Sequence, residues 1–101
     1  MAILSVSEYS RLGRDSQANV IQTGPEPARV YQELAIGAGS VQSAAFDSAT
    51  RFLRVHADAP CRVLFGTNPT AAVGTSPRMA ANSTEFFEVQ PLQKIAVITS
   101  A

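Results

Sequence analysis

The sequence is poor in the residues on which catalytic, metal and disulfide sites depend. It contains no tryptophan, one cysteine, one histidine and two tyrosines among 101 residues. One cysteine excludes an internal disulfide, and one cysteine with one histidine falls short of the roughly three to four ligands of a zinc site. The chain has no G-x-S-x-G motif, and nothing in the sequence orients His56 as a base. We therefore expect no enzyme activity, no metal and no cofactor.

Charge is also scarce, and lysine is almost absent. Only 16% of the residues are charged, below the roughly 25% that is typical of soluble domains. Eight basic residues balance eight acidic ones, so the chain lacks the basic excess of a nucleic-acid-binding protein. Lys94 is the only lysine, and the other basic residues are arginines, which suit interfaces. This composition is typical of a surface that is partly covered in an assembly. Compositional drift in a GC-rich genome, which also favours arginine over lysine, explains it equally well.

Membrane and export signals are missing as well. No run approaches the roughly 20 apolar residues of a membrane helix. Residues 1–13, "MAILSVSEYSRLG", have neither the basic start nor the long apolar core of a signal peptide. We expect a protein that is kept in a cytoplasm until it is assembled or released, without membrane contact.

What the chain does contain is a series of short apolar runs between turn signals, with no helical periodicity. About seven short strands predict an all-β domain, a small antiparallel β-sandwich or barrel. The length suffices for one domain. Residues 1–28 are more polar and end in "GPEPA", where two prolines force an extended or turning path. We expect an N-terminal arm or edge segment over residues 1–28 and the β domain over residues 29–101.

Three hairpins are expected, around "GAG" (37–39), "DAP" (58–60) and "PLQ" (91–93). In the second hairpin, a turn centred on Asp58 gathers the apolar side chains on one face, whereas a slip of one residue mixes them with charges. Burying such charges costs several kcal/mol unless they are paired. This register places Val55 opposite Cys61 and predicts that the Cys61 thiol is buried and inert. The expected core residues of the last two hairpins are Leu53, Val55, Ala57, Cys61, Val63, Phe65, Phe87, Val89, Ile95 and Val97.

The outer faces of these two hairpins are the candidate partner surface. The same register sets Arg54 directly opposite Arg62, which is unfavourable in an isolated protein. Large apolar residues beside arginines are typical of interfaces. Two alternatives stay open: some of these residues pack under the arm or the long loop, or the register differs. The candidate contact residues are Phe52, Arg54, His56, Arg62, Leu64, Phe86 and Ile98.

Two stretches in the second half of the chain carry a family resemblance. "RFLRVHADAPCRVLFGTNPTA" (51–71) and "TEFFEVQPLQKIAVI" (84–98) resemble small virion proteins of tailed bacteriophages. The shared pattern is a strand, "DAPC", a strand that ends in "FGTNPTA", an aromatic "EFF" and a closing "KIAVI", and it consists mostly of turn and core residues. The resemblance implies a β-sandwich that decorates the capsid or lies at the head–tail region.

The function that this implies is a non-enzymatic structural subunit of the virion, a capsid decoration or cement protein. It would be assembled in the host cytoplasm and would bind the major capsid protein or other virion proteins, with further copies of itself as a second partner. We expect no nucleic-acid partner. The alternatives are a neck or tail accessory protein and a glycan-binding β-sandwich module. The glycan-binding alternative requires a patch of surface aromatics, and a chain with no tryptophan and two tyrosines is poorly suited to it.

Overall fold

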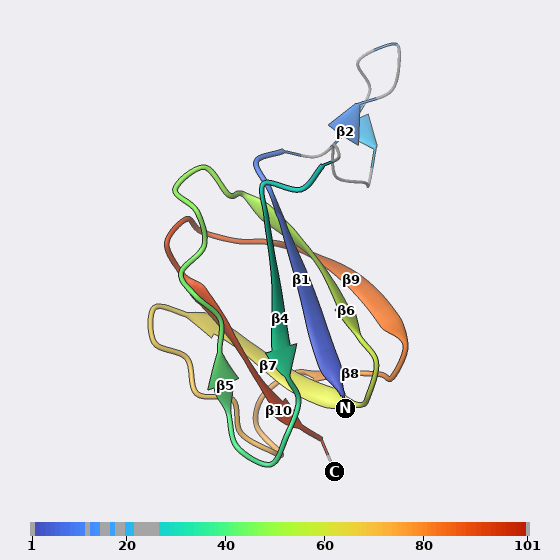
Figure 1. The fold of residues 1–101 in the computed structure, drawn as a ribbon, viewed down its shortest axis with the longest axis vertical. Coiled ribbons are helices and arrows are strands. Elements are labelled where there is room, and N and C mark those ends of the chain that lie inside the picture. The colour runs from blue at the N-terminus through green and yellow to red at the C-terminus, as the bar shows by residue number, and fades with distance from the viewer. Residues whose placement is uncertain (1, 12, 15–16, 18–19, 22–26, 101) are drawn as a thin grey trace.

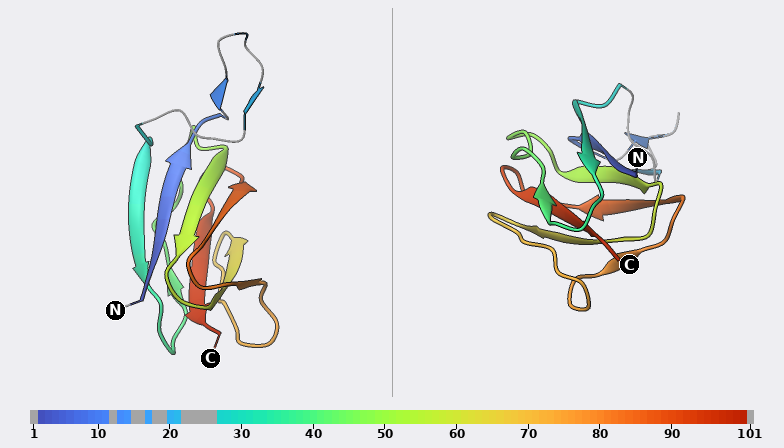
Figure 2. Two further views of the ribbon diagram at one scale, coloured as in Figure 1. Left: turned by 90° about the vertical axis from the view of Figure 1, so that its right-hand side faces the viewer. Right: turned by 60° about the horizontal axis from the view of Figure 1, so that its bottom comes forward.

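The computed structural model describes residues 2–11, 13–14, 17, 20–21 and 27–100. Eight strands form two antiparallel four-stranded sheets that pack face to face as a sandwich (Figure 1, Figure 2), which confirms the predicted all-β fold. The first sheet has the order β4 (Val30–Ala35), β1 (Ile3–Tyr9), β6 (Phe52–Ala57) and β9 (Ser83–Glu88). The second sheet has the order β5 (Val41–Gln42), β10 (Lys94–Thr99), β7 (Cys61–Gly66) and β8 (Arg78–Met79).

A separate two-stranded ladder joins β2 (Gly13–Arg14) to β3 (Val20–Ile21) beyond one end of the sandwich (Figure 1). The sequence predicts an arm over residues 1–28, but β1 lies between β4 and β6 in the first sheet. Its inward side chains Leu4 and Val6 are fully buried. Residues 3–9 are therefore part of the sandwich. Residues 1, 12, 15–16, 18–19 and 22–26 of the predicted arm lie outside the described part of the chain.

The three predicted hairpins are instead crossings from one sheet to the other. Strand β6 pairs with β1 and β9, whereas β7 pairs with β10 and β8. Val55 therefore lies beside Val6 and Glu85, and the predicted pairing with Cys61 is wrong. Strands β4 and β5 also belong to different sheets, as do β9 and β10.

The alternation of apolar and polar residues explains why the core residues were predicted correctly and the strand pairing was not. Alternation determines which side of a strand faces the core, but it does not determine which strand lies beside it. In a crossing, the apolar sides of two successive strands face each other through the core instead of lying next to each other in one sheet. The predicted core residues accordingly are buried or, for Phe65 and Phe87, pack against the buried cluster. Their rings lie 5.0 Å apart between centroids.

A long loop, residues 67–77, runs along the outer side of the second sheet (Figure 2, right). Outward side chains of the sheet hold it: Gln42 donates to the carbonyl of Pro69 at 2.7 Å, and Arg62 Nη1 donates to the carbonyl of Ser76 at 2.9 Å. The loop residue Ala71 is buried, with its N–H bound to Ser40 Oγ at 2.9 Å. The loop therefore covers part of this outer face and leaves the rest open.

Candidate partner surface

The side chains predicted to contact a partner lie on two opposite sides of the sandwich. Because β6 and β9 belong to the first sheet and β7 and β10 to the second, their outward side chains point in opposite directions. The expected juxtaposition of Arg54 with Arg62 is wrong, since Arg54 lies beside Ser7 and Phe86. The first sheet carries Phe52, Arg54, His56 and Phe86, and the second sheet carries Arg62, Leu64 and Ile98.

On the first sheet, the predicted contact residue Phe52 is not available to a partner. Phe52 is only 5% exposed, because it packs among other aromatic side chains on this face. Its ring stacks on Tyr9 with centroids 5.2 Å apart and lies 6.4 Å from the ring of Phe86. Phe52 therefore stabilises the sheet, and the expectation that it is an outward anchor is corrected.

The remaining outward residues of the first sheet are mixed in charge. Arg54 is exposed, and the half-buried His56 has its Nδ1 atom 2.8 Å from Thr84 Oγ1. On β4, the exposed Tyr31 places its hydroxyl 2.7 Å from Glu33 Oε2. This face thus presents both positive and negative charges.

The second sheet has charges of one sign only. Its four strands and the loop 67–77 contain no aspartate and no glutamate. Their charged residues are Arg62, Arg78 and Lys94. The strands of the first sheet contain the opposite balance, with one arginine and the acidic residues Glu8, Glu33, Glu85 and Glu88.

We use the name basic face for the outward residues Arg62, Leu64, Arg78, Lys94 and Ile98 of the second sheet. Alternation with the buried Ile95 and Val97 directs Lys94 and Ile98 outward. Ile98, Arg62 and Arg78 form one row across β10, β7 and β8. Leu64 is 36% exposed, so an apolar side chain lies open beside the row.

Arg78 and Lys94 are the members of the basic face that the predicted contact residues did not include, and Arg78 is the harder of the two to find from the sequence. It lies in a segment rich in proline and small residues, where strand β8 is only two residues long. Its alternation with the buried Met79 is the only local signal, and two residues are too few to establish a period. The pairing of Arg78 with Arg62 depends on strand neighbours that the sequence does not specify.

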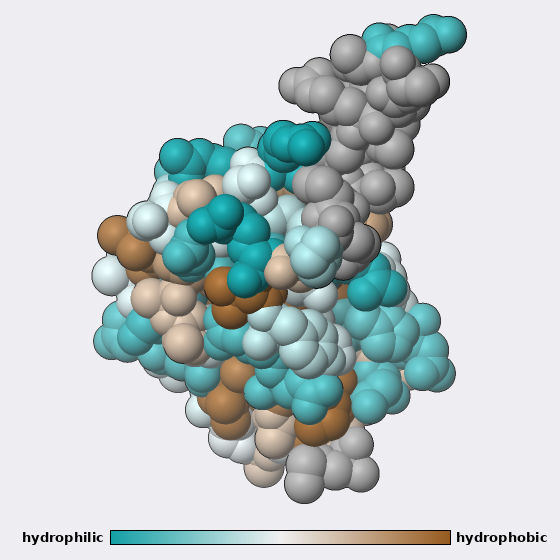
Figure 3. All heavy atoms as spheres, turned by 45° about the horizontal axis from the view of Figure 1, so that its top comes forward, coloured by the Kyte–Doolittle hydropathy of each residue, from teal (hydrophilic) through white to brown (hydrophobic). Residues whose placement is uncertain are grey.

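Exposed apolar side chains elsewhere do not gather into one large patch in the view of Figure 3, where polar atoms interrupt them. The most exposed are Leu92 at 62%, Tyr31 at 56% and Val73 at 51%. They belong to a turn, to the first sheet and to the loop over the second sheet, respectively. The basic face is therefore distinguished by its charge and not by apolar area alone.

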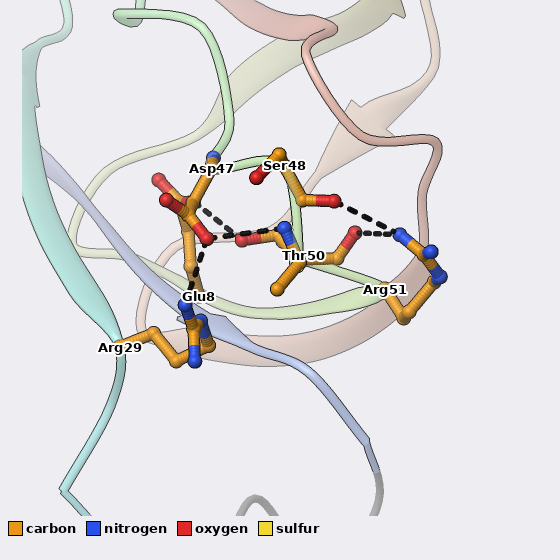
Figure 4. Close-up of polar contacts among 7 residues, drawn as sticks. Glu8, Arg29, Asp47, Ser48, Thr50 and Arg51 are labelled. Carbon is orange, nitrogen blue, oxygen red and sulfur yellow. Dashed lines mark hydrogen bonds and ion pairs between the residues drawn. The ribbon is translucent and has the colours of Figure 1, made fainter.

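A buried carboxylate at one end of the sandwich is the centre of a polar cluster (Figure 4). Glu8 is completely buried, and its Oε1 accepts bonds from the N–H of Asp47 at 2.9 Å and from Thr50 Oγ1 at 2.8 Å. Its Oε2 accepts a bond from Gln32 Nε2 at 2.8 Å. These donors replace the water that the carboxylate loses on burial. The cluster attaches the loop before β6 to the end of β1.

Asp47 extends this cluster toward solvent. Its Oδ2 atom accepts a bond from the N–H of Ala49 at 3.1 Å and lies 2.9 Å from Nη2 of Arg29. The Ala49 N–H and the Arg29 guanidinium lower the pKa of Asp47 below its ordinary value. These contacts of Asp47 fix the loop before β6 against Arg29.

The thiol and the imidazole that the sequence places close together do not meet in the structure. Cys61 faces the core from the second sheet and is fully buried, whereas His56 faces outward on the first sheet. Burial, followed by the charge of Glu85, raises the pKa of Cys61 to about 11. The described residues contain no group of three or more His, Cys, Asp or Glu placed to hold a metal ion.

Comparison with known proteins found no matching family, no matching curated protein and no matching solved structure. Within the described ranges, no helix is long and apolar enough to cross a membrane.

Proposed function

We propose that this protein is a non-enzymatic structural subunit of a tailed-phage virion, a capsid decoration protein that binds the shell through its basic face. The proposal combines the sequence resemblance to small virion proteins with the charge distribution of the two sheets. The single observation that supports it most is that Arg62, Arg78 and Lys94 lie on a sheet without any acidic residue, beside Leu64 and Ile98.

This face gains little in an isolated molecule. The directly opposed Arg62 and Arg78 repel each other, and the open Leu64 side chain remains in water. A shell surface that presents carboxylates and an apolar depression removes both costs. Charge-assisted hydrogen bonds contribute about 1.5–3 kcal/mol each, and the burial of a large apolar side chain contributes about 1.5–3 kcal/mol. The ordering of side chains and their desolvation offset much of this gain.

The test is the composition of purified particles. We expect this protein in complete virions and in tail-less DNA-filled heads at the same fixed number of copies per major capsid protein, measured by quantitative mass spectrometry. Its presence in virions but absence from tail-less heads would assign it to the neck or tail. Its absence from both kinds of particle would contradict the proposal.

A further inference from the structure

We propose that Arg62 and Arg78 form a binding site for carboxylates, and that acidic side chains of a partner protein occupy it. The inference deepens the proposed function, on which it rests for the identity of the partner. It concerns the chemistry that the basic face recognises, which neither the strand pattern nor the family resemblance specifies.

Arg62 and Arg78 lie on neighbouring strands, and the described part of the chain supplies no counter-charge to either. Arg62 and Arg78 are directly aligned across β7 and β8. Their acceptors are neutral: Arg62 Nη1 donates to the carbonyl of Ser76 at 2.9 Å, and Arg78 Nε donates to Ser100 Oγ at 3.4 Å. The ion pair found among the described residues, Arg29 with Asp47, lies elsewhere. Each guanidinium has five N–H donors, and each of the two donates one hydrogen bond to these neutral acceptors, so donors are left for an anion.

Burial increases the cost of this arrangement. Arg62 is half-buried, and its Nε atom is out of contact with solvent and has no hydrogen-bond partner. A buried donor without an acceptor and a partly desolvated charge are both unfavourable. Water solvates the positive charge of the half-buried Arg62 incompletely. An anion bound to the guanidinium groups of Arg62 and Arg78 would neutralise this charge. The planar array of donors on each arginine matches the two oxygens of a carboxylate.

The surroundings favour an acidic protein segment over a nucleic acid. Binding along a phosphate backbone requires a longer basic track than Arg62, Arg78 and Lys94 supply, and the chain has no net positive charge. Leu64 and Ile98 lie next to the arginines, and such apolar side chains fit the leucines or valines of a protein segment. The expected partner segment therefore alternates acidic residues with small ones and carries an apolar residue beside them.

The experiment measures fluorescence anisotropy of two rhodamine-labelled peptides, LSESEL and its uncharged counterpart LSQSQL, mixed with the full chain. We expect LSESEL to bind at least about tenfold more tightly than LSQSQL, and the variant R62Q/R78Q to lose this difference. The matched control is R54Q, which removes one exposed arginine from the opposite face and should leave LSESEL binding unchanged within about twofold. Circular dichroism checks that both variants fold.

Four results of these solution measurements would overturn the inference. One is equal binding of the two peptides, and another is an equal loss of LSESEL binding in R54Q. The third is tighter binding of a labelled hexathymidylate than of LSESEL with the same dependence on Arg62 and Arg78, which would point to nucleic acid. If sedimentation shows self-association that R62Q/R78Q abolishes and LSESEL does not compete with, the occupant is a second copy and the inference is wrong.

A second measurement on the unaltered protein does not depend on the folding of a variant. We expect addition of LSESEL to shift the side-chain Nε–Hε resonances of Arg62 and Arg78 in a two-dimensional NMR spectrum, with Arg54 unchanged. Shifts of equal size at all three arginines would show unspecific screening and would contradict the site. Failure of this experiment would leave the particle composition test intact, so the two proposals can fail separately.

Discussion

Arg54 and Arg62 lie on consecutive strands, yet their side chains project from opposite outer faces of the sandwich. The connection between these strands crosses from one sheet to the other, anchored by a 2.6 Å hydrogen bond from the Ile3 N–H to Asp58 Oδ1. The two arginines therefore belong to different surfaces, and a change at one of them should not imitate a change at the other.

The first prediction compares Arg62→Glu with Arg54→Glu, two variants with the same change in charge. Arg62→Glu should reduce occupancy on particles at least about tenfold, because it removes a charge-assisted contact and adds a repulsive one. Arg54→Glu should keep normal occupancy. Occupancy is measured beside the melting temperature of each variant. Equal loss in both variants, with folding intact, would contradict the assignment of the partner to the basic face.

The contrast between these arginines also shows which features of the fold could be predicted from the sequence. The burial of Leu53, Val55 and Val63 could be predicted, because alternation along a strand determines the face of each side chain. Strand neighbours could not, because a short turn such as "DAP" fits a hairpin and a crossing alike. Successive strands are usually neighbours in one sheet, so the sequence alone favours the hairpin.

The candidate site was predictable only in part for the same reason. Arg62, Leu64 and Ile98 have outward positions in the sequence pattern, and the structure brings them together on the second sheet. Phe52 has the same outward position, but the Tyr9 ring covers it, and that contact comes from a strand more than 40 residues earlier in the chain. Such long-range contacts leave no local signal.

The second prediction concerns the buried carboxylate of Glu8. Glu8→Ala leaves the donors of Asp47, Thr50 and Gln32 without their acceptor, and each buried unsatisfied donor costs about 1–3 kcal/mol. We expect a total loss of roughly 3 kcal/mol or more in the free energy of unfolding, measured by urea denaturation. Glu88→Gln, at an exposed position, is the control and should change stability by less than about 0.5 kcal/mol. A small effect of Glu8→Ala would show that water or another group takes over its bonds.

The third prediction concerns the pH dependence that Cys61 confers. Its folded-state pKa is raised to about 11 from an ordinary value of 9.0, so between these values the unfolded chain releases its thiol proton and the folded chain retains it. The contribution to stability is therefore complete below pH 9 and is lost as the pH rises toward 11. Cys61→Ala should lack this part of the slope in urea denaturation across that range. Identical slopes for both proteins would contradict a buried, protonated thiol.

The fourth prediction concerns the turn before β10. Leu92 has a φ of 67°, a backbone conformation that few residues other than glycine adopt without strain. Its side chain is 62% exposed, so removing it costs little packing. Leu92→Gly should stabilise the protein by about 1 kcal/mol, which raises the melting temperature by about 4–8 °C in a domain of this size. Leu92→Ala removes the same exposed side chain but keeps the Cβ atom, so it should give little of this gain. Equal melting temperatures for the two variants would show that backbone strain is absent.

The most direct test of the account is a hydroxyl-radical footprint of the protein, free and bound to particles, read out by mass spectrometry. If the basic face binds the shell, labelling of Leu64 and Ile98 should fall strongly on binding, while Tyr31 on the opposite sheet stays labelled. This measurement compares the two faces of the unaltered protein in one sample. Protection of Tyr31 with unchanged labelling of Leu64 and Ile98 would contradict the central claim.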